Sequence, residues 1–362
     1  MAHKKLSKVK DRLWTISITQ KKAMNLKHLL PFLGLVLFSD ISCAQNIDPL
    51  RLGFEAYQLK TEEWGEINYY LTPSSDDEPM PLMVYLDGSG ADPLFQQVEQ
   101  GISSSIALNY QQLSQSYRVL VISKPGVSFI DKVPLEASGS PGHREPAAYT
   151  ERLSLAWRVE STHLIIQKLI KEKEIDPKQL VVFGFSEGAQ VAPFVAEKNE
   201  HVSHILLFGG NGLNQFFDPI ITARQKALTG QISEEEAQQT IDSLYLVYQD
   251  IYAEPTSTDK RWWGHTYKRW SSFTQRDPLN VLVELDLPVY MANGSLDENS
   301  VLSADYIKLE FIRQGKQNLT YKTYPNYDHQ FNELIFENGT FKDAIPQLDN
   351  VLNAALEWLK DN

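Results

Sequence analysis

Residues 180–188 read LVVFGFSEG, and this stretch indicates the fold more clearly than any other. The apolar residues 180–183 predict a buried strand, and apolar residues at helical spacing follow at 189–197. Between them lies the only G-x-S-x-G pattern of the chain, with Ser186 at its centre. Flanking glycines leave room for the backbone in a tight strand-to-helix turn, which keeps the serine hydroxyl accessible. The stretch therefore predicts that Ser186 is a nucleophile.

Short apolar runs that alternate with helical patterns extend this interpretation along the chain. Such alternation is typical of a parallel sheet that helices cover on both faces. A polar hairpin is expected to precede the sheet at 52–59 and 66–71, and 319–324 is a candidate edge strand. We therefore predict an α/β fold with a mostly parallel central sheet. The apolar runs are 82–86, 119–122, 180–185, 205–208 and 289–292, and the other helical patterns are 151–174 and 345–359.

Residues 211–288 form a much longer connection than a crossover between two strands needs. Ser233 and Glu236 form a capping box, which predicts a helix to about residue 252. Aromatic residues at helical spacing follow from Trp262 to Phe273. We predict a helical cap inserted between two core segments, 45–210 and 289–362. Most of its rings are expected to pack on the core, and Trp262 and Trp263 are the candidates for substrate binding.

A serine hydroxyl is a weak nucleophile at neutral pH and needs an adjacent base. His329 follows the last predicted strand, and it is the only histidine after residue 297. Asp297 follows the predicted strand 289–292 and could hold the tautomer of the imidazole. Glu298 is its local competitor, whereas Asp328 is expected to be solvated or structural.

An oxyanion hole requires backbone N–H groups that point at the developing negative charge. The residue after the nucleophile, Glu187, is expected to supply one of them. The other is expected from the loop after the strand 82–86, which reads Asp87-Gly88-Ser89-Gly90. The amide of Ser89 is the first candidate and that of Gly90 the second.

The order Ser186, Asp297, His329 resembles that of the α/β-hydrolase superfamily, and the resemblance spans residues 80–335. GFSEG followed by Ala189 is similar to the nucleophile elbows of carboxylesterases, acyl thioesterases and dienelactone-hydrolase-like enzymes. The loop with Gly294, Asp297 and Val301 resembles their acid-bearing loop. These families commonly have His-Gly where this chain has Asp87-Gly88, and that difference leaves the subfamily and the polarity of the pocket open.

The resemblance implies hydrolysis of an ester or related acyl bond through an acyl-enzyme, with no cofactor. A serine peptidase on the same fold is one alternative, and a non-catalytic binding protein of this fold is another. No Cys/His cluster has metal-ligand spacing and no glycine-rich phosphate loop is present, so no metal is expected. The net charge of −12 and the lack of a basic block after residue 27 argue against a nucleic-acid partner. The expected partner is a small acyl or ester substrate.

The N-terminal residues 29–38 read LLPFLGLVLF, an apolar run too short to span a membrane. Small residues follow at Ser42-Cys43-Ala44, as before a signal-peptide cleavage site. We predict that 1–44 is an upstream extension with a signal peptide and that the protein is secreted or periplasmic. Cys43, the only cysteine, is a less favoured site of lipid anchoring because Asp40 stands where lipoprotein signals carry an aliphatic residue.

Overall fold

The computed structural model describes residues 47–74, 79–98, 101–132, 145–298 and 300–362. The predicted signal peptide, with Cys43, lies outside these residues. Among the described helices, none is both long and apolar enough to cross a membrane.

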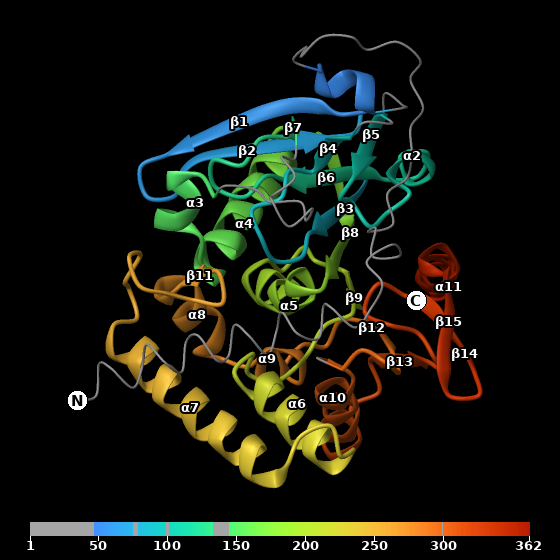
Figure 1. The fold of residues 1–362 in the computed structure, drawn as a ribbon. Coiled ribbons are helices and arrows are strands. Elements are labelled where there is room, and N and C mark those ends of the chain that lie inside the picture. Colours follow the sequence, from blue (N-terminus) through green and yellow to red (C-terminus); the bar gives the residue numbers. More distant parts are fainter. Residues whose placement is uncertain (1–46, 75–78, 99–100, 133–144, 299) are drawn as a thin grey trace.

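A twisted central sheet organises the described residues (Figure 1). Its eight strands lie in the order β1-β2-β6-β3-β8-β9-β12-β13, and the six from β6 to β13 are parallel. The hairpin β1–β2 joins the sheet by antiparallel pairing of β2 with β6. The predicted mostly parallel sheet is confirmed, with β13 at its edge. The strands are β1 Glu55–Thr61, β2 Gly65–Leu71, β3 Met80–Leu86, β6 Arg118–Ile122, β8 Ile175–Phe185, β9 His204–Phe208, β12 Val289–Gly294 and β13 Leu319–Tyr324.

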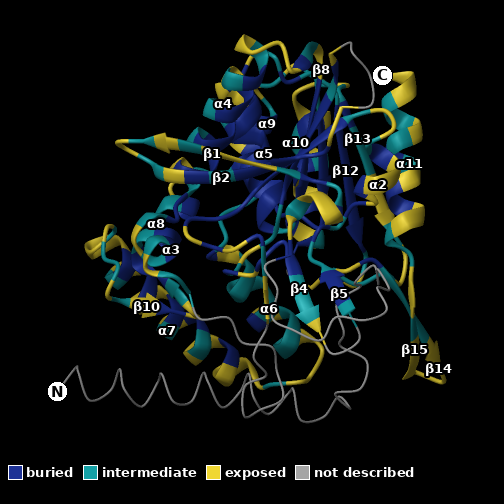
Figure 2. Ribbon diagram, turned by 90° about the horizontal axis from the view of Figure 1, so that it is seen from above, coloured by how far each residue is buried: buried dark blue, intermediate teal, exposed yellow. Residues whose placement is uncertain are grey.

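Both faces of this sheet are buried, which explains why its strands are continuously apolar. In β3, Leu82 and Val84 point into one core cluster, whereas Met83 and Tyr85 point into the other. Helices lie on opposite sides of the sheet over these clusters (Figure 2). One face is covered by α4 Leu155–Lys171, α5 Glu187–Lys198, α9 Pro278–Leu282 and α10 Val301–Arg313, and the other by α2 Tyr110–Leu113 and α11 Leu348–Asp361.

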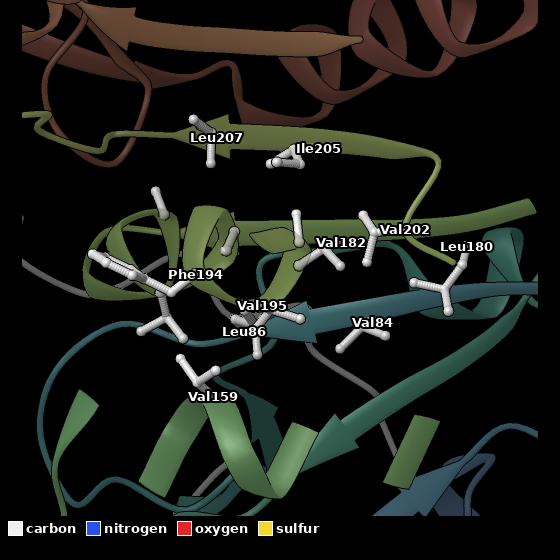
Figure 3. Close-up of a cluster of buried hydrophobic side chains, with 14 of the residues drawn as sticks. Val84, Leu86, Val159, Leu180, Val182, Phe194, Val195, Val202, Ile205 and Leu207 are labelled. Atoms are coloured by element: carbon white, nitrogen blue, oxygen red, sulfur yellow. The ribbon is translucent and has the colours of Figure 1, made fainter. Parts of the chain in front are cut away.

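Figure 3 shows where α5 packs on the centre of the sheet. Val195 of the helix lies beside Leu86 of β3, and Phe194 lies towards Val159 of α4, and all four belong to the same buried cluster. Residues 187–196 of α5 are all buried. Burial of each large aliphatic side chain contributes about 1.5–3 kcal/mol, so α5 is held firmly on the sheet.

The helix predicted over 151–174 is two helices, α3 Ala147–Arg152 and α4. The helical conformation is interrupted between them because Ser154 is extended. Ser154 caps α4 by accepting a hydrogen bond from the N–H of Trp157 at 3.1 Å. Residues 175–185 then form the long strand β8.

The helix predicted from residue 345 begins only at Leu348. Residues before it form a hairpin that was not predicted, β14 Asn332–Glu337 with β15 Thr340–Pro346. Asn338 and Gly339, with φ of 51° and 77°, make the two-residue turn that this pairing requires. A small sheet of β4 Phe95–Val98, β5 Gly101–Ser104 and β7 Ile130–Lys132 was also not predicted.

The segment between β9 and β12 is mainly helical, as expected for a cap. Both hydrogen bonds of the capping box at Ser233 and Glu236 are present. Residues 261–266 form a short hairpin rather than the start of a helix, because Trp263 and Gly264 turn the chain at positive φ. The elements of this segment are α6 Phe217–Leu228, α7 Glu234–Ala253, β10 Arg261–Trp262, β11 His265–Thr266, α8 Tyr267–Thr274 and α9.

The cap has its own aromatic cluster, in which Phe216 stacks on Tyr248 at 4.0 Å. Its C-terminal part belongs instead to the main core, where Phe273 and Leu282 are buried with residues of α5. The predicted insertion 211–288 therefore combines a separate small core with an anchor on the central one.

Candidate active site

Ser186 lies between the last residue of β8 and the first of α5. Its backbone has φ 55° and ψ −118°, a strained conformation for a residue other than glycine. Two main-chain hydrogen bonds hold the turn: Ser186 N–H donates to Phe208 O at 2.8 Å, and Ala189 N–H donates to Ser186 O at 3.0 Å. The strand, turn and helix predicted around this serine are thus present.

The two glycines of the motif permit very close backbone approaches. A Cβ atom on Gly184 would lie 2.3 Å from Gly188 O, and one on Gly188 would lie 1.9 Å from Leu86 O. The second contact places the start of α5 directly against the end of β3. Any side chain at residue 188 would separate these two elements.

We expect Gly188→Ala to prevent stable folding, because no rotamer change can relieve a collision with the backbone of β3. Gly230→Ala is the matched control, since Gly230 has φ 73° and no atom within 4 Å of the added Cβ. The free energy of unfolding of this control should fall by only about 1 kcal/mol. Urea denaturation measures both variants, and equal losses of stability would contradict this interpretation of the motif.

Three loops at the carboxyl ends of β8, β12 and β13 bring Ser186, Asp297 and His329 together. His329 Nδ1 lies 2.7 Å from Asp297 Oδ2, and His329 Nε2 lies 3.0 Å from Ser186 Oγ. A carboxylate only accepts, so Nδ1 donates to Asp297 and Nε2 is left to accept from the serine hydroxyl. The three residues selected from the sequence therefore form a continuous hydrogen-bonded chain.

Asp297 is buried, and Ser300 Oγ also donates to its Oδ2. Burial alone would lower the pKa of His329, but the hydrogen bond and the charge of Asp297 raise it above its ordinary value of 6.5. The competing Glu298 is exposed. Asp328 accepts the backbone N–H groups of Gln330 and Asn332, at 2.9 and 2.8 Å, and so holds the loop that carries His329.

Two further glycines let these loops converge, and the sequence analysis singled out only Gly294. A Cβ on Gly294 would lie 2.3 Å from Tyr327 O, and one on Gly209 would lie 3.1 Å from His329 Cε1. Each stands at or directly after the end of a parallel strand. A glycine directly after a predicted strand is the signal that could have identified Gly209.

Both predicted oxyanion loops lie beside Ser186. Glu187 is the first residue of α5, so its N–H is among those without a partner inside the helix, at the positive end of the helix dipole. Gly88 lies against the serine, since a Cβ built on it would be 3.4 Å from Ser186 Cβ. The roles of the Glu187 and Ser89 amides remain predictions.

A buried chain of ion pairs runs beneath these two loops. Asp87 binds Lys124 Nζ at 2.7 Å with one oxygen and Arg158 Nη2 at 2.7 Å with the other. Arg158 also binds Glu187 Oε1 at 2.9 Å, and the other oxygen of Glu187 binds Arg269 of α8. The side chains are 2–4% exposed except that of Asp87, at 15%.

Their ion pairs favour the charged forms of Glu187 and Arg158 despite the burial of both side chains. Burial would raise the pKa of Glu187, but Arg269 and Arg158 hold it well below its ordinary value. Burial would likewise lower the pKa of Arg158, yet Asp87 and Glu187 raise it. Among the described residues, the printed ion pairs of the network join three basic side chains to two acidic ones. The sequence analysis missed Lys124, Arg158 and Arg269; the aspartate at residue 87 was the one visible sign that a cation had to be near.

Replacing Glu187 by glutamine should destabilise the protein by about 3–5 kcal/mol, because two buried guanidinium groups lose their shared anion. The folded-state pKa of Glu187 is depressed, so this contribution is fully present above pH about 4.5 and declines at lower pH. The measurement is the free energy of unfolding in urea at pH 7 and pH 4.

Glu160→Gln is the matched control, since Glu160 pairs with Lys198 at 2.8 Å on the surface. A loss below about 1 kcal/mol is expected there. If Glu187→Gln and Glu160→Gln lower the free energy of unfolding by the same small amount, the buried ion network does not stabilise the protein more than a surface ion pair does.

The two tryptophans predicted to bind substrate lie in the cap. Trp262 is buried in its aromatic cluster, where its carbonyl accepts from Trp270 Nε1 at 2.7 Å. Trp263 is 53% exposed and stacks on Trp262 at 4.4 Å. Substrate binding by either ring stays a prediction. Within the described residues, no three His, Cys, Asp or Glu side chains gather as metal ligands would.

No protein-family model matches this chain, and no curated protein does. Solved structures resemble it at low sequence identity. A dipeptidyl aminopeptidase IV of Bacteroides ovatus matches 85% of the chain with a TM-score of 0.51 and 13% identity. Dipeptidyl peptidase 4 of Porphyromonas gingivalis matches 85% with a TM-score of 0.50 and 15% identity. Est1E of Butyrivibrio proteoclasticus matches 84% with a TM-score of 0.48 and 12% identity.

The match covers 36% and 35% of the two peptidases and 98% of Est1E. The chain therefore spans about a third of the length of the peptidases. Together with the sheet order, the likeness to the two peptidases, with TM-scores of 0.51 and 0.50, shows that this chain has the α/β-hydrolase fold that its sequence predicts.

Proposed function

We propose that this chain is a serine hydrolase that cleaves an ester or related acyl bond through an acyl-enzyme on Ser186. The observation that carries the proposal is the hydrogen-bonded chain from Asp297 through His329 to a serine on a strained turn. Such a chain is what activates a hydroxyl that is otherwise a poor nucleophile.

In this mechanism His329 Nε2 takes the proton of Ser186 as Oγ attacks the acyl carbon. The N–H groups of Glu187 and Ser89 stabilise the oxyanion of the tetrahedral intermediate. His329 then gives the proton to the leaving oxygen, and the bond to the leaving group breaks. Water, deprotonated by the same imidazole, attacks the acyl carbon; the bond to Ser186 Oγ then breaks, the imidazolium returns the proton to Oγ, and the acid is released. Asp297 stabilises the imidazolium in both halves.

A serine peptidase on the same fold is the second candidate, and the two peptidase structures with TM-scores of 0.51 and 0.50 favour it. A complete triad disfavours the third candidate, a non-catalytic binding protein. The apolar run 29–38 and the small residues before Gln45 support the further proposal that the protein is exported.

Purified protein should react with a fluorophosphonate probe at Ser186, because an activated serine attacks the phosphorus and displaces fluoride. Ser186→Ala should not be labelled. Ser243→Ala, on the exposed face of α7, is the matched control and should be labelled like the wild type. A folded wild type that remains unlabelled would contradict the proposed function. A panel of acyl esters and amino-acid amides then separates the esterase from the peptidase.

The rate of hydrolysis should decline at low pH with a midpoint above about 6.5, since only neutral His329 can accept the serine proton and its pKa is raised. Asp297→Asn should lower kcat by roughly 10⁴-fold and move the midpoint to lower pH. Asp305→Asn, which changes a carboxylate on α10 that binds Tyr321, is the control. A profile whose acidic limb is unaffected by Asp297→Asn would count against the assigned acid.

A further inference from the structure

A buried lysine lies under the loop that is proposed to supply the second oxyanion donor. Lys124 Nζ lies 2.7 Å from Asp87 Oδ2, 2.5 Å from Gly88 O and 2.8 Å from Gly90 O. An ammonium group has three donors, and these three acceptors use all of them. Its side chain is 2% exposed. Lys124 therefore binds the Asp87–Gly90 loop at three points.

The two carbonyl contacts fix the direction of backbone N–H groups. In a planar trans peptide the C=O of one residue and the N–H of the next point in opposite directions. With Gly88 O turned to Lys124, the N–H of Ser89 points away from the lysine, on the opposite side of the loop. Gly88 itself lies against Ser186. Lys124 thus determines the orientation of the peptide plane that carries the Ser89 donor.

The same ion network reaches the other oxyanion donor. Asp87, which Lys124 binds, pairs with Arg158, and Arg158 pairs with the carboxylate of Glu187. The backbone N–H of Glu187 is the donor at the start of α5. The two donors are therefore connected through side chains that water hardly reaches.

We propose that Lys124 is a positioning residue of the oxyanion hole, which orients the Ser89 amide directly and is coupled to the Glu187 amide through Asp87 and Arg158. The proposal rests on the proposed function. Lys124 touches no reacting atom, so its removal should weaken transition-state stabilisation while substrate binding is retained. A merely structural lysine would lower the stability of the fold without changing the kcat of the folded enzyme.

The test compares Lys124→Met, Lys124→Arg and Lys316→Met in the full chain. Methionine retains the length of the side chain and removes its donors and charge. Arginine keeps the charge, but each of its terminal nitrogens has only two N–H donors, so none can bind all three acceptors that Lys124 Nζ binds. Lys316 is the matched control. Its Nζ binds two acceptors, Leu285 O at 2.7 Å and Asp286 Oδ1 at 3.0 Å. Lys316 precedes β13 and so lies at the amino ends of the parallel strands, whereas Ser186 follows the carboxyl end of β8.

The readouts are ester hydrolysis, affinity for an aryl trifluoromethyl ketone, and thermal denaturation. Ser186 Oγ adds to the ketone carbonyl, whose oxygen becomes an alkoxide in the oxyanion hole. For Lys124→Met we expect kcat to fall roughly 10²-fold, with KM changed less than about 3-fold. The affinity for the ketone should fall by the same factor as kcat/KM. Lys124→Arg should lie between this variant and the wild type, and Lys316→Met should match the wild type.

Lys124→Met that folds and retains the kcat and ketone affinity of the wild type overturns the inference. If Lys124→Met does not fold, Lys124→Arg decides, and wild-type kcat and ketone affinity in that variant overturn it. A wild type that neither reacts with fluorophosphonate nor binds the ketone overturns the proposed function and this inference together. If the wild type is active and the Lys124 variants have the same kcat and ketone affinity, the inference about Lys124 is overturned and the proposed function stands.

Discussion

The turn at Ser186 is the constraint on which the rest of the site depends. A residue other than glycine at positive φ costs about 1–3 kcal/mol, and the buried face of α5 and the bond to Phe208 O offset that cost. The turn lies at the centre of the sheet, where β8 has β3 on one side and β9 on the other. Because the strands are parallel, the loops that follow β3, β9, β12 and β13 all leave at the same edge. Ser186 there meets Asp297, His329 and the Asp87–Gly90 loop, which come from separate parts of the chain.

Buried ion pairs also connect the carboxyl ends of the strands to the cap. Removing Arg158, Glu187 and Arg269 from water is expensive, and an apolar replacement of the whole set would be about as stable. The arrangement persists because each member is paired, so the cap helix α8 must be docked for Glu187 to have both partners. Arg269 also lies over the rings of Trp270 and Phe273, at 4.3 and 4.5 Å. The cap is therefore attached to the nucleophile helix by electrostatics as well as by apolar packing.

Local signals explain what could be predicted from the sequence. The strand, the glycines and the helix around Ser186 are adjacent in the chain, and Asp297 and His329 each follow a recognisable strand. The hairpin at 332–346 was missed although Asn338-Gly339 is a strong turn signal, because its strands are only half-buried or exposed and lack the continuous apolar runs that mark the central strands. The partners of the ion network could not be predicted in this way. They are 29 to 82 residues apart in the chain, and a buried charge has no periodicity that reveals its partner.

The ion network explains why residue 87 is an aspartate, although the loops that this one resembles commonly carry histidine there. Lys124 and Arg158 are both buried within bonding distance of residue 87, and a histidine there would leave two cations beside a group without negative charge. Glu187 could then offset only part of three positive charges, and the desolvation of the remainder would be uncompensated. Asp87, Lys124 and Arg158 are therefore physically interdependent, since the aspartate makes the two cations tolerable and the lysine in turn uses the carbonyls of the same loop. A change at any one of these positions alone would alter the orientation of the loop that lies against Ser186.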